Sequence, residues 1–170
     1  MSSPAAQPSG TAPNPVVRLA YDEARVGLNE QDDTLANVRN RATGLLAAAT
    51  VGTSFSATAG LLNNDPTHGK VFPVWGAWLL LAVLLAIAAG VMIVLWPTND
   101  WVFGPDPGKL LDSANLELDD VLTRATQAMI VYRRRNAEIL NRRFTAYRLA
   151  ASALVIEVGL LVVVLLIARR

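Results

Sequence analysis

The feature that most constrains this chain is an uncharged run at residues 74–96, VWGAWLLLAVLLAIAAGVMIVLW. A helix needs about 20 consecutive apolar residues to cross the hydrocarbon core of a bilayer. Trp75, Trp78 and Trp96 lie toward the ends of the run and Trp101 follows it, and tryptophan is enriched at membrane–water interfaces. Only 17 % of the chain is charged, against about 25 % in soluble domains. We therefore predict a transmembrane helix over 74–96.

Two other segments are long and almost free of charge. Residues 149–168 carry one carboxylate, Glu157, and residues 43–62 carry no charge but are rich in Ala, Gly, Ser and Thr. If all three segments cross the bilayer, twelve of the fifteen Lys and Arg residues lie on one side. The positive-inside rule makes that side cytoplasmic. The sequence thus predicts a multi-pass protein of the plasma (inner) membrane, with its N-terminus in the cytoplasm and its C-terminus outside.

The charged segments before the first and third spans show helical periodicity. Apolar residues recur with alternating spacings of four and three in residues 16–42 and 113–148, and each pattern leads into a span. Such heptad seams indicate helix–helix contacts, and an oligomeric coiled coil and an intrachain hairpin both fit. The seam positions are Val17, Tyr21, Ala24, Leu28, Leu35, Val38, Ala42 and Leu45, then Leu118, Leu122, Ala125, Met129, Tyr132, Ile139, Ala146 and Ala150, with Gln31, Asn136 and Arg143 as polar interruptions.

The predicted fold class is therefore all-α: three transmembrane helices and a cytoplasmic helical bundle continuous with spans one and three. Residues 1–15, rich in Pro, Ser and Ala, are expected to be a disordered cytoplasmic tail. Residues 63–73 form a short outer loop. The Pro- and Gly-rich residues 97–112 are expected to be an irregular linker, with Asp112 or Ser113 capping the helix that follows.

Small residues occupy every fourth position of the first span. A stripe of this kind lets two helices approach closely in a membrane, where packing and interhelical hydrogen bonds replace the hydrophobic effect. Either the stripe packs the first span against the other two, or it mediates oligomerisation or lines a polar pathway beside the hydroxyls of Thr50, Ser54 and Thr58. The stripe consists of Gly44, Ala48, Gly52, Ser56 and Gly60.

Glu157 is the one carboxylate within a predicted span. It lies about eight residues into that span, or roughly 12 Å at 1.5 Å per residue, which is the depth expected for Thr50 and Ser54 of the first span. A charge at the centre of a span costs at least about 2.5–3.5 kcal/mol, so we expect Glu157 to face the bundle interior and to form a hydrogen bond with Thr50 or Ser54. This site is either functional or a structural link between helices.

Six arginines lie in residues 132–148, directly before the third span. Arginine pairs bidentately with phosphate, so Arg133, Arg134, Arg135 and Arg142 are candidates for binding a phosphate-bearing ligand. The alternative is that they attract anionic headgroups and fix the topology. The chain contains no Cys and one His, and shows no nucleophile–base set, metal cluster or Gly-rich phosphate loop. We expect no enzymatic activity, no metal site and no cofactor.

The layout resembles the membrane effectors of Pycsar antiphage defence. The likeness lies in a first helix ending in RNRATGLLAAATVGTSF, a second span closing on LWP, and the final stretch AMIVYRRRNAEILNRRFTAYRLAASALVIEVGLL. Membrane domains of the SLATT type, tied to nucleotide-signalled defence, are similar in layout. The resemblance implies a cyclic-nucleotide-gated effector: a cyclic pyrimidine nucleotide binds the cytoplasmic part, and the transmembrane bundle then assembles or opens and impairs the membrane.

Two other classes of function fit the same residues. One is a structural or accessory membrane protein that acts through its helix–helix seams. The other is a small constitutive ion or proton pathway that uses Glu157 and the hydroxyl row. The expected partners are the lipid bilayer, a cyclic nucleotide and further copies of the chain in a homo-oligomer. With a net charge of +1, no nucleic-acid partner is expected.

Overall fold

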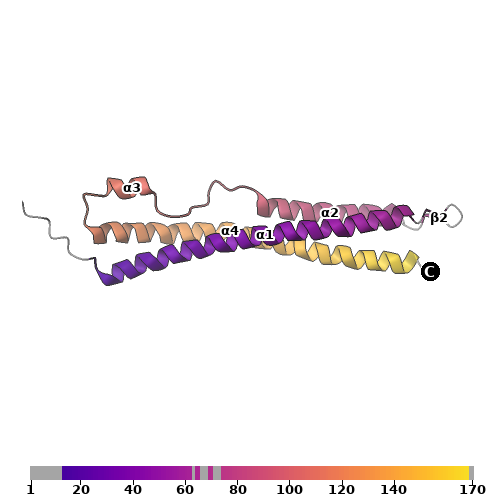
Figure 1. The fold of residues 1–170 in the computed structure, drawn as a ribbon, viewed down its shortest axis with the longest axis horizontal. Helices are drawn as coiled ribbons and strands as arrows, with labels where there is room; N and C mark the ends of the chain where they lie inside the picture. The colour runs from indigo at the N-terminus through magenta and orange to yellow at the C-terminus, as the bar shows by residue number, and fades with distance from the viewer. Residues whose placement is uncertain (1–12, 63, 66–68, 71–73, 169–170) are drawn as a thin grey trace, which may run out of the picture. The chain divides into compact units, whose positions relative to one another are not determined.

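A computed structural model describes residues 13–62, 64–65, 69–70 and 74–168 of the chain. The described residues are almost entirely helical (Figure 1), and a two-residue antiparallel pair joins the first two long helices. The elements in chain order are α1 (Pro15–Leu62), β1 (Asn64–Asp65), β2 (Gly69–Lys70), α2 (Val74–Leu95), α3 (Pro107–Asp112) and α4 (Leu118–Ala168).

The chain divides into two compact units. Unit 1 consists of Met1–Asp32 and Val102–Asn136, and unit 2 consists of Asp33–Trp101 and Ala137–Arg170. Unit 1 thus holds the beginnings of α1 and α4 together with α3, whereas unit 2 holds the remainder of α1 and α4 together with α2. Both α1 and α4 are unbroken helices that contribute residues to each unit.

The two predicted heptad seams form the buried faces of α1 and α4. In α1 the buried seam residues are Leu28, Leu35, Val38 and Ala42. In α4 the buried seam residues include the polar ones, and they are Ala125, Met129, Asn136, Arg143, Ala146 and Ala150. The prediction of helix–helix contact is confirmed within the chain, because the chain itself covers these faces, but the two helices form a parallel pair and not a hairpin.

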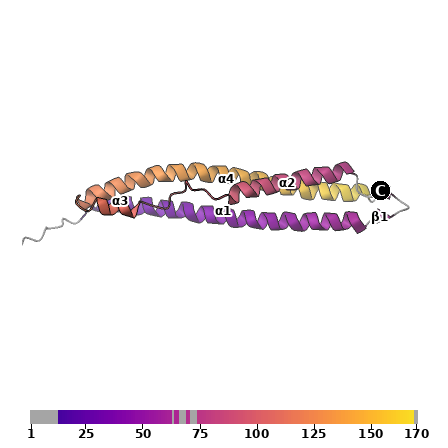
Figure 2. The ribbon, with the colours of Figure 1, turned by 90° about the horizontal axis from the view of Figure 1, so that it is seen from above.

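Within each unit, α1 and α4 run in the same direction (Figures 1 and 2). In unit 1, the Asn14 backbone N–H donates to Asp119 Oδ1 at 2.9 Å and Gln31 Nε2 donates to the Arg133 carbonyl at 3.0 Å. The residue numbers of both partners increase from the first contact to the second, so the two helices are parallel. In unit 2, α2 runs opposite to α1, so that it returns along the pair.

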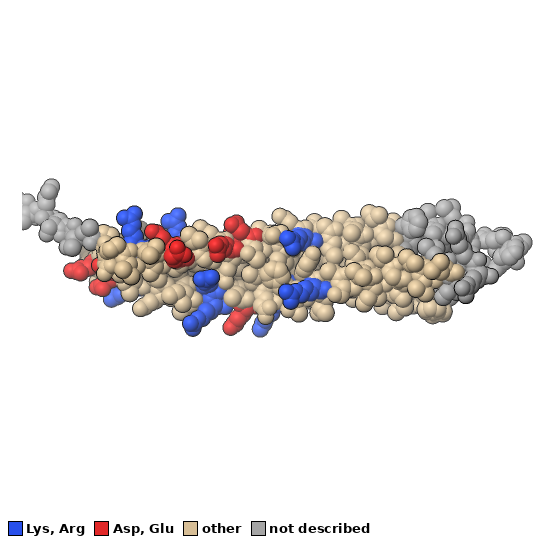
Figure 3. All heavy atoms as spheres, turned by 90° about the horizontal axis from the view of Figure 1, so that it is seen from below, with Lys and Arg blue, Asp and Glu red and all other residues tan. Residues whose placement is uncertain are grey.

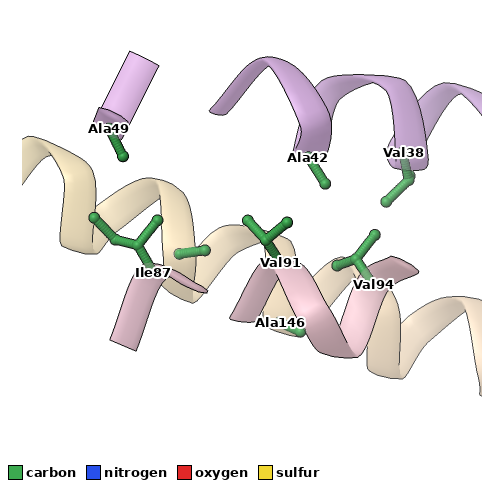
Figure 4. Close-up of a cluster of buried hydrophobic side chains, with 8 residues drawn as sticks. Val38, Ala42, Ala49, Ile87, Val91, Val94 and Ala146 are labelled. Atoms are coloured by element: carbon green, nitrogen blue, oxygen red, sulfur yellow. The ribbon is translucent and has the colours of Figure 1, made fainter. Parts of the chain in front are cut away.

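The core of unit 2 is built from small and β-branched side chains (Figure 4). Gly90 of α2 shows how close its helices come: a Cβ at this position would stand 2.9 Å from Ala150 Cβ and 3.2 Å from the Ala146 carbonyl oxygen of α4. Close backbone approach through small residues is the packing mode of helices in lipid. The core residues are Val38, Ala42, Ala49, Ile87, Val91, Val94, Ala146 and Ala150.

Unit 2 also exposes large apolar side chains. Among the described residues, two helices are long and apolar enough to cross a membrane: α2 over Trp75–Leu95, and α4, within Leu118–Val163. Only 22 % and 17 % of their apolar windows are buried, whereas a core helix of a soluble protein is mostly buried. On the face drawn in Figure 3, charged side chains gather over one part and leave a wide uncharged surface. These features are compatible with a membrane protein.

The described part of α1 does not reach this apolarity. Its last charged residue is Arg41, and α1 continues without a charge to Leu62, but the side chains of residues 55–62 lie outside the described residues. Two of the three predicted spans thus have the length and composition of a membrane helix, and the span over 43–62 stays a prediction.

Two predicted boundaries differ from the structure. The helix expected from residue 113 begins at Leu118, and the linker expected to be irregular contains α3. The proposed cap is wrong: Ser113 closes the C-terminus of α3, whose N-cap is Asp106, with Pro107 after it. Asp–Pro at a helix start satisfies a free N–H and presets the backbone angle. The predicted tail lies outside the described residues apart from residues 13–15, and the outer loop lies outside them apart from β1 and β2.

Candidate functional site

Arg143 holds the C-terminal end of α2. It occupies a seam position of α4 and is only 4 % exposed. Its Nη1 donates to the Val94 carbonyl at 3.0 Å, and its Nη2 donates to the Trp96 carbonyl at 2.8 Å and to the Thr98 hydroxyl. The last carbonyls of a helix lack intrahelical donors and carry partial negative charge. The guanidinium therefore satisfies these carbonyls and opposes the helix dipole.

The Arg143 guanidinium caps the C-terminal end of α2, and Arg39 places a second positive charge near this cap. Burial lowers the pKa of the Arg143 guanidinium from its ordinary value, and the charge of Arg39 in α1 lowers it further. Arg39 Nε is itself buried and has no hydrogen-bond partner among the residues that the structure describes. Two guanidinium groups thus make the electrostatic potential positive where α2 ends.

A hollow of about 520 Å³ opens beside the cap within unit 2. Its apolar wall is formed by Ala89, Met92 and Ile93 of α2, which share one helix face at i, i+3 and i+4. Trp96, one turn further along that face, also lines the hollow and is 63 % exposed. This wall is therefore a strip of the exposed apolar surface of α2.

The other end of the same hollow is polar. Thr98 and Asp100 contribute from the segment after α2, while Arg142 and Arg143 contribute from α4 together with Ile139. Arg143 is committed to the α2 carbonyls, whereas the Arg142 side chain is exposed. One carboxylate and two guanidinium groups line this end, and Arg39 adds a further positive charge near Arg143.

Glu157 is buried in unit 2, as its position in an apolar helix requires. It is 2 % exposed, and Thr53 Oγ1 of α1 donates to its Oε1 at 3.1 Å. The Thr53 hydroxyl also lies 2.9 Å from the Ala49 carbonyl, so its single proton has two acceptors. Glu157 Oε2 is buried without a hydrogen-bond partner in the described part of the chain.

The hydroxyl predicted to meet Glu157 was placed on the wrong residue. Thr50 and Ser54 are exposed, and their hydroxyls donate to the carbonyls of Leu46 and Thr50, both at 2.8 Å. The depth estimate was close, because Thr53 lies within one turn of both. Depth along a helix does not fix the side of the helix, and the side that faces α4 carries Thr53.

The small-residue stripe does not pack the first span against α2 or α4 in the residues described. Gly44 and Ala48 are exposed, and a Cβ added at Gly44 or Gly52 would meet nothing within 4 Å. The seam explains this: at 100° per residue, Gly44 stands about 200° from the buried Ala42. The side chains of the remaining members, Ser56 and Gly60, and of Thr58 lie outside the described residues.

The four predicted phosphate-binding arginines are divided between the units. Arg133, Arg134 and Arg135 lie in unit 1 and Arg142 lies in unit 2, and all four side chains are exposed. The Arg133 guanidinium covers Gly27 of α1, where a Cβ would stand 3.1 Å from Cζ and Nη1. Of the four predicted arginines, only Arg133, Arg134 and Arg135 could therefore bind a ligand within unit 1.

Asn136, regarded from sequence as an interruption of the seam, fixes the linker in unit 1. It is fully buried, donates through Nδ2 to the Val102 carbonyl at 2.8 Å, and accepts from the Val102 N–H through Oδ1 at 3.3 Å. Sequence reasoning missed the roles of Asn136, Arg143 and Thr53. The signal for the first two was present, because a polar residue at a heptad seam position must find a partner inside the interface.

Comparisons with known proteins find no match: no family model, no curated protein and no solved structure is similar to this chain. Within the described residues there is no group of three or more His, Cys, Asp or Glu side chains able to hold a metal ion. The site is thus defined by its own geometry: a cationic cap beside an amphipathic hollow, and a buried carboxyl deeper in unit 2.

Proposed function

We propose that this protein is a three-span membrane effector of antiphage defence that is controlled by a phosphate-bearing ligand on its cytoplasmic side. The observation that carries the proposal is the continuity of α1 and α4. Each is one uninterrupted helix that begins among charged residues in unit 1 and ends among apolar residues in unit 2. The proposal is that a ligand bound in unit 1 acts on the apolar unit through these shared helices.

The membrane arrangement follows from composition. The exposed apolar faces of α2 and α4 in unit 2 would contact lipid, and α1, with weaker hydrophobes, would cross beside them. This gives a multi-pass protein of the plasma membrane with unit 1 in the cytoplasm, by the excess of Lys and Arg on that side. A homo-oligomer is part of the proposal, since no described residue covers the stripe at Gly44 and Ala48.

The proposed ligand is a cyclic nucleotide. Support comes from the resemblance to Pycsar effectors and from Arg133, Arg134 and Arg135, which present exposed guanidinium groups in unit 1. Arg133 lies on α1 through Gly27, so a phosphate bound there would act on the contact between α1 and α4. A ligand shifts a conformational equilibrium only by its difference in affinity for the two states, and a site at this contact provides such a difference.

The test is dye release from liposomes that contain the full-length protein, with and without each member of a panel of cyclic mononucleotides and cyclic oligonucleotides. We expect release with one nucleotide and none without it. Arg134→Gln should abolish the response, while Arg124→Gln, an exposed arginine earlier in α4, should preserve it. Inserted protein that releases no dye with any nucleotide would refute the gated effector.

The buried carboxyl favours a second candidate, a constitutive proton pathway. Glu157 Oε2 lacks a hydrogen-bond partner among the described residues. When the carboxyl carries a proton, it can donate to Thr53 Oγ1 and leave the threonine proton for the Ala49 carbonyl, so the contact between Glu157 and Thr53 can form with or without that proton. This candidate predicts proton leak into liposomes without any nucleotide, and loss of that leak in Glu157→Gln.

A further inference from the structure

We infer that the hollow at the end of α2 is a binding site for one anionic phospholipid, with the phosphate held by Arg142 and an acyl chain against α2. The inference is independent of the proposed nucleotide, whose candidate residues lie in unit 1. It rests on the order of polar and apolar groups around the hollow, on the charge at its polar end, and on its place beside an exposed apolar helix.

The lining changes in character along α2. The lining residues of α2 from Ala89 to Trp96 are all apolar, and they cover a rise of about 10 Å at 1.5 Å per residue. Met92 and Ile93 within this strip are more than half exposed. A soluble phosphate compound would leave such a strip uncovered, whereas an acyl chain would cover it, because burying apolar area is favourable by about 25 cal/mol per Å².

Trp96 marks the level of the change. It lies at the end of the apolar strip and is followed by Thr98 and Asp100 in the lining. Tryptophan is enriched where acyl chains meet headgroups. The polar end of the hollow therefore lies at headgroup level when α2 crosses the bilayer.

The charge at this level selects an anion. The guanidinium of Arg143 is held by the carbonyls of Val94 and Trp96, and the neighbouring Arg39 keeps the local potential positive. Arg142 is exposed beside them and has the planar donor pair that matches a phosphate. Asp100 is the one carboxylate of the lining, and it can accept from a headgroup hydroxyl such as those of phosphatidylglycerol.

The position of Arg142 distinguishes it from the other arginines before the third span. Juxtamembrane arginines in general attract anionic lipid diffusely. Arg148 is also exposed and lies nearer to the apolar end of α4, yet it does not line the hollow. A specific site thus predicts that replacing Arg142 weakens lipid binding and that replacing Arg148 does not. Diffuse attraction predicts that both replacements weaken lipid binding equally.

The experiment is native mass spectrometry of the full-length protein released from detergent micelles supplemented with phosphatidylglycerol or, separately, phosphatidylcholine. We expect one retained phosphatidylglycerol per chain and no retained phosphatidylcholine. Arg142→Gln should weaken retention about tenfold, the loss expected for a charge-assisted hydrogen bond, and Arg148→Gln should leave it unchanged. Arg142→Lys, which keeps the charge without the fork, should fall between them.

The apolar end is tested separately. Ala89→Phe should fill the hollow and reduce retention, while Ala82→Phe, an exposed alanine two turns away on the same helix, should not. Circular dichroism and gel filtration confirm that each variant is folded.

Three results would overturn the inference. Equal losses in Arg142→Gln and Arg148→Gln would mean diffuse attraction. Equal retention of both lipids would remove the anion selectivity. Displacement of phosphatidylglycerol by millimolar inorganic phosphate would assign the polar end to a soluble phosphate ligand instead of a lipid.

Discussion

Replacing Arg143 by methionine tests the reasoning about the polar seam most directly. Methionine keeps much of the length of the side chain but removes the hydrogen bonds to the Val94 and Trp96 carbonyls and to Thr98. A hydrogen bond from a charged donor contributes about 1.5–3 kcal/mol, and contributions within one group do not add. We therefore expect a loss of about 2–4 kcal/mol in the free energy of unfolding.

Arg39 also lets us predict the sign of the coupling between the two arginines, which a packing argument alone would not give. Its charge disfavours the charged form of Arg143, so removing Arg143 also relieves repulsion, and this relief offsets part of the loss. In an Arg39→Met background there is no repulsion to relieve. The cost of Arg143→Met should therefore be larger in that background than in the native sequence, by the 0.5 kcal/mol or more that marks coupled residues.

The assay is reversible unfolding in mixed micelles, followed by circular dichroism and completed as a double-mutant cycle. Arg148→Met is the matched control, since Arg148 is exposed in the same helix, and surface substitutions usually change stability by less than about 0.5 kcal/mol. Two results would refute the reasoning: a loss for Arg143→Met no larger than that of the control, or a smaller cost in the Arg39→Met background than in the native sequence.

The remaining predictions concern the interior of unit 2. Thr53→Val should cost about 1–3 kcal/mol, because the buried Glu157 loses its described donor; the same unfolding assay measures it, and an unchanged midpoint would contradict the contact. Gly90→Ala should destabilise by about 1–3 kcal/mol, since its Cβ would stand 2.9 Å from Ala150 Cβ. Gly159→Ala, which meets nothing within 4 Å, should be neutral or stabilising; a loss equal to that of Gly90→Ala would refute the close approach.

The helices and their contact faces could be predicted from the sequence because a single periodicity specifies both. The 4-3 spacing that indicates a helix also selects the side it buries, and Leu28, Leu35, Val38 and Ala42 are buried accordingly. The start of α4 could not be predicted, because nothing in the apolar pattern distinguishes residue 113 from residue 118. The short helix α3 is indicated in the sequence only by the local Asp106–Pro107 signal.

The partner of Glu157 shows where the sequence argument reaches its limit. Counting 1.5 Å per residue gives the depth of a side chain, and the depth pointed to the right turn of α1. Choosing among Thr50, Thr53 and Ser54 requires the rotation of α1 relative to α4. That rotation is set by the whole seam, since Ala42 and Ala49 are already buried on one side, and Thr53 follows Ala49 by four residues, about one turn.

The polar residues of the seams bear on how a gated effector would work. Gln31 donates to the Arg133 carbonyl, Asn136 pairs with the linker, and Glu157 accepts from Thr53. Buried polar positions of this kind commonly fix the register of a helix pair at a cost in stability. Sliding α1 along α4 by one turn, about 5.4 Å, would break the Gln31 contact within unit 1 or the Thr53 contact within unit 2.

A ligand that drives such a slide must compensate for those contacts. Moving a two-state equilibrium from 1:99 to 99:1 takes a difference in binding free energy of about 5.5 kcal/mol. Each broken polar contact accounts for about 1 kcal/mol of that difference, the value of a typical hydrogen bond. These contacts therefore add to the stability of the resting state, and weakening one of them, as in Thr53→Val, should lower the ligand concentration needed for dye release.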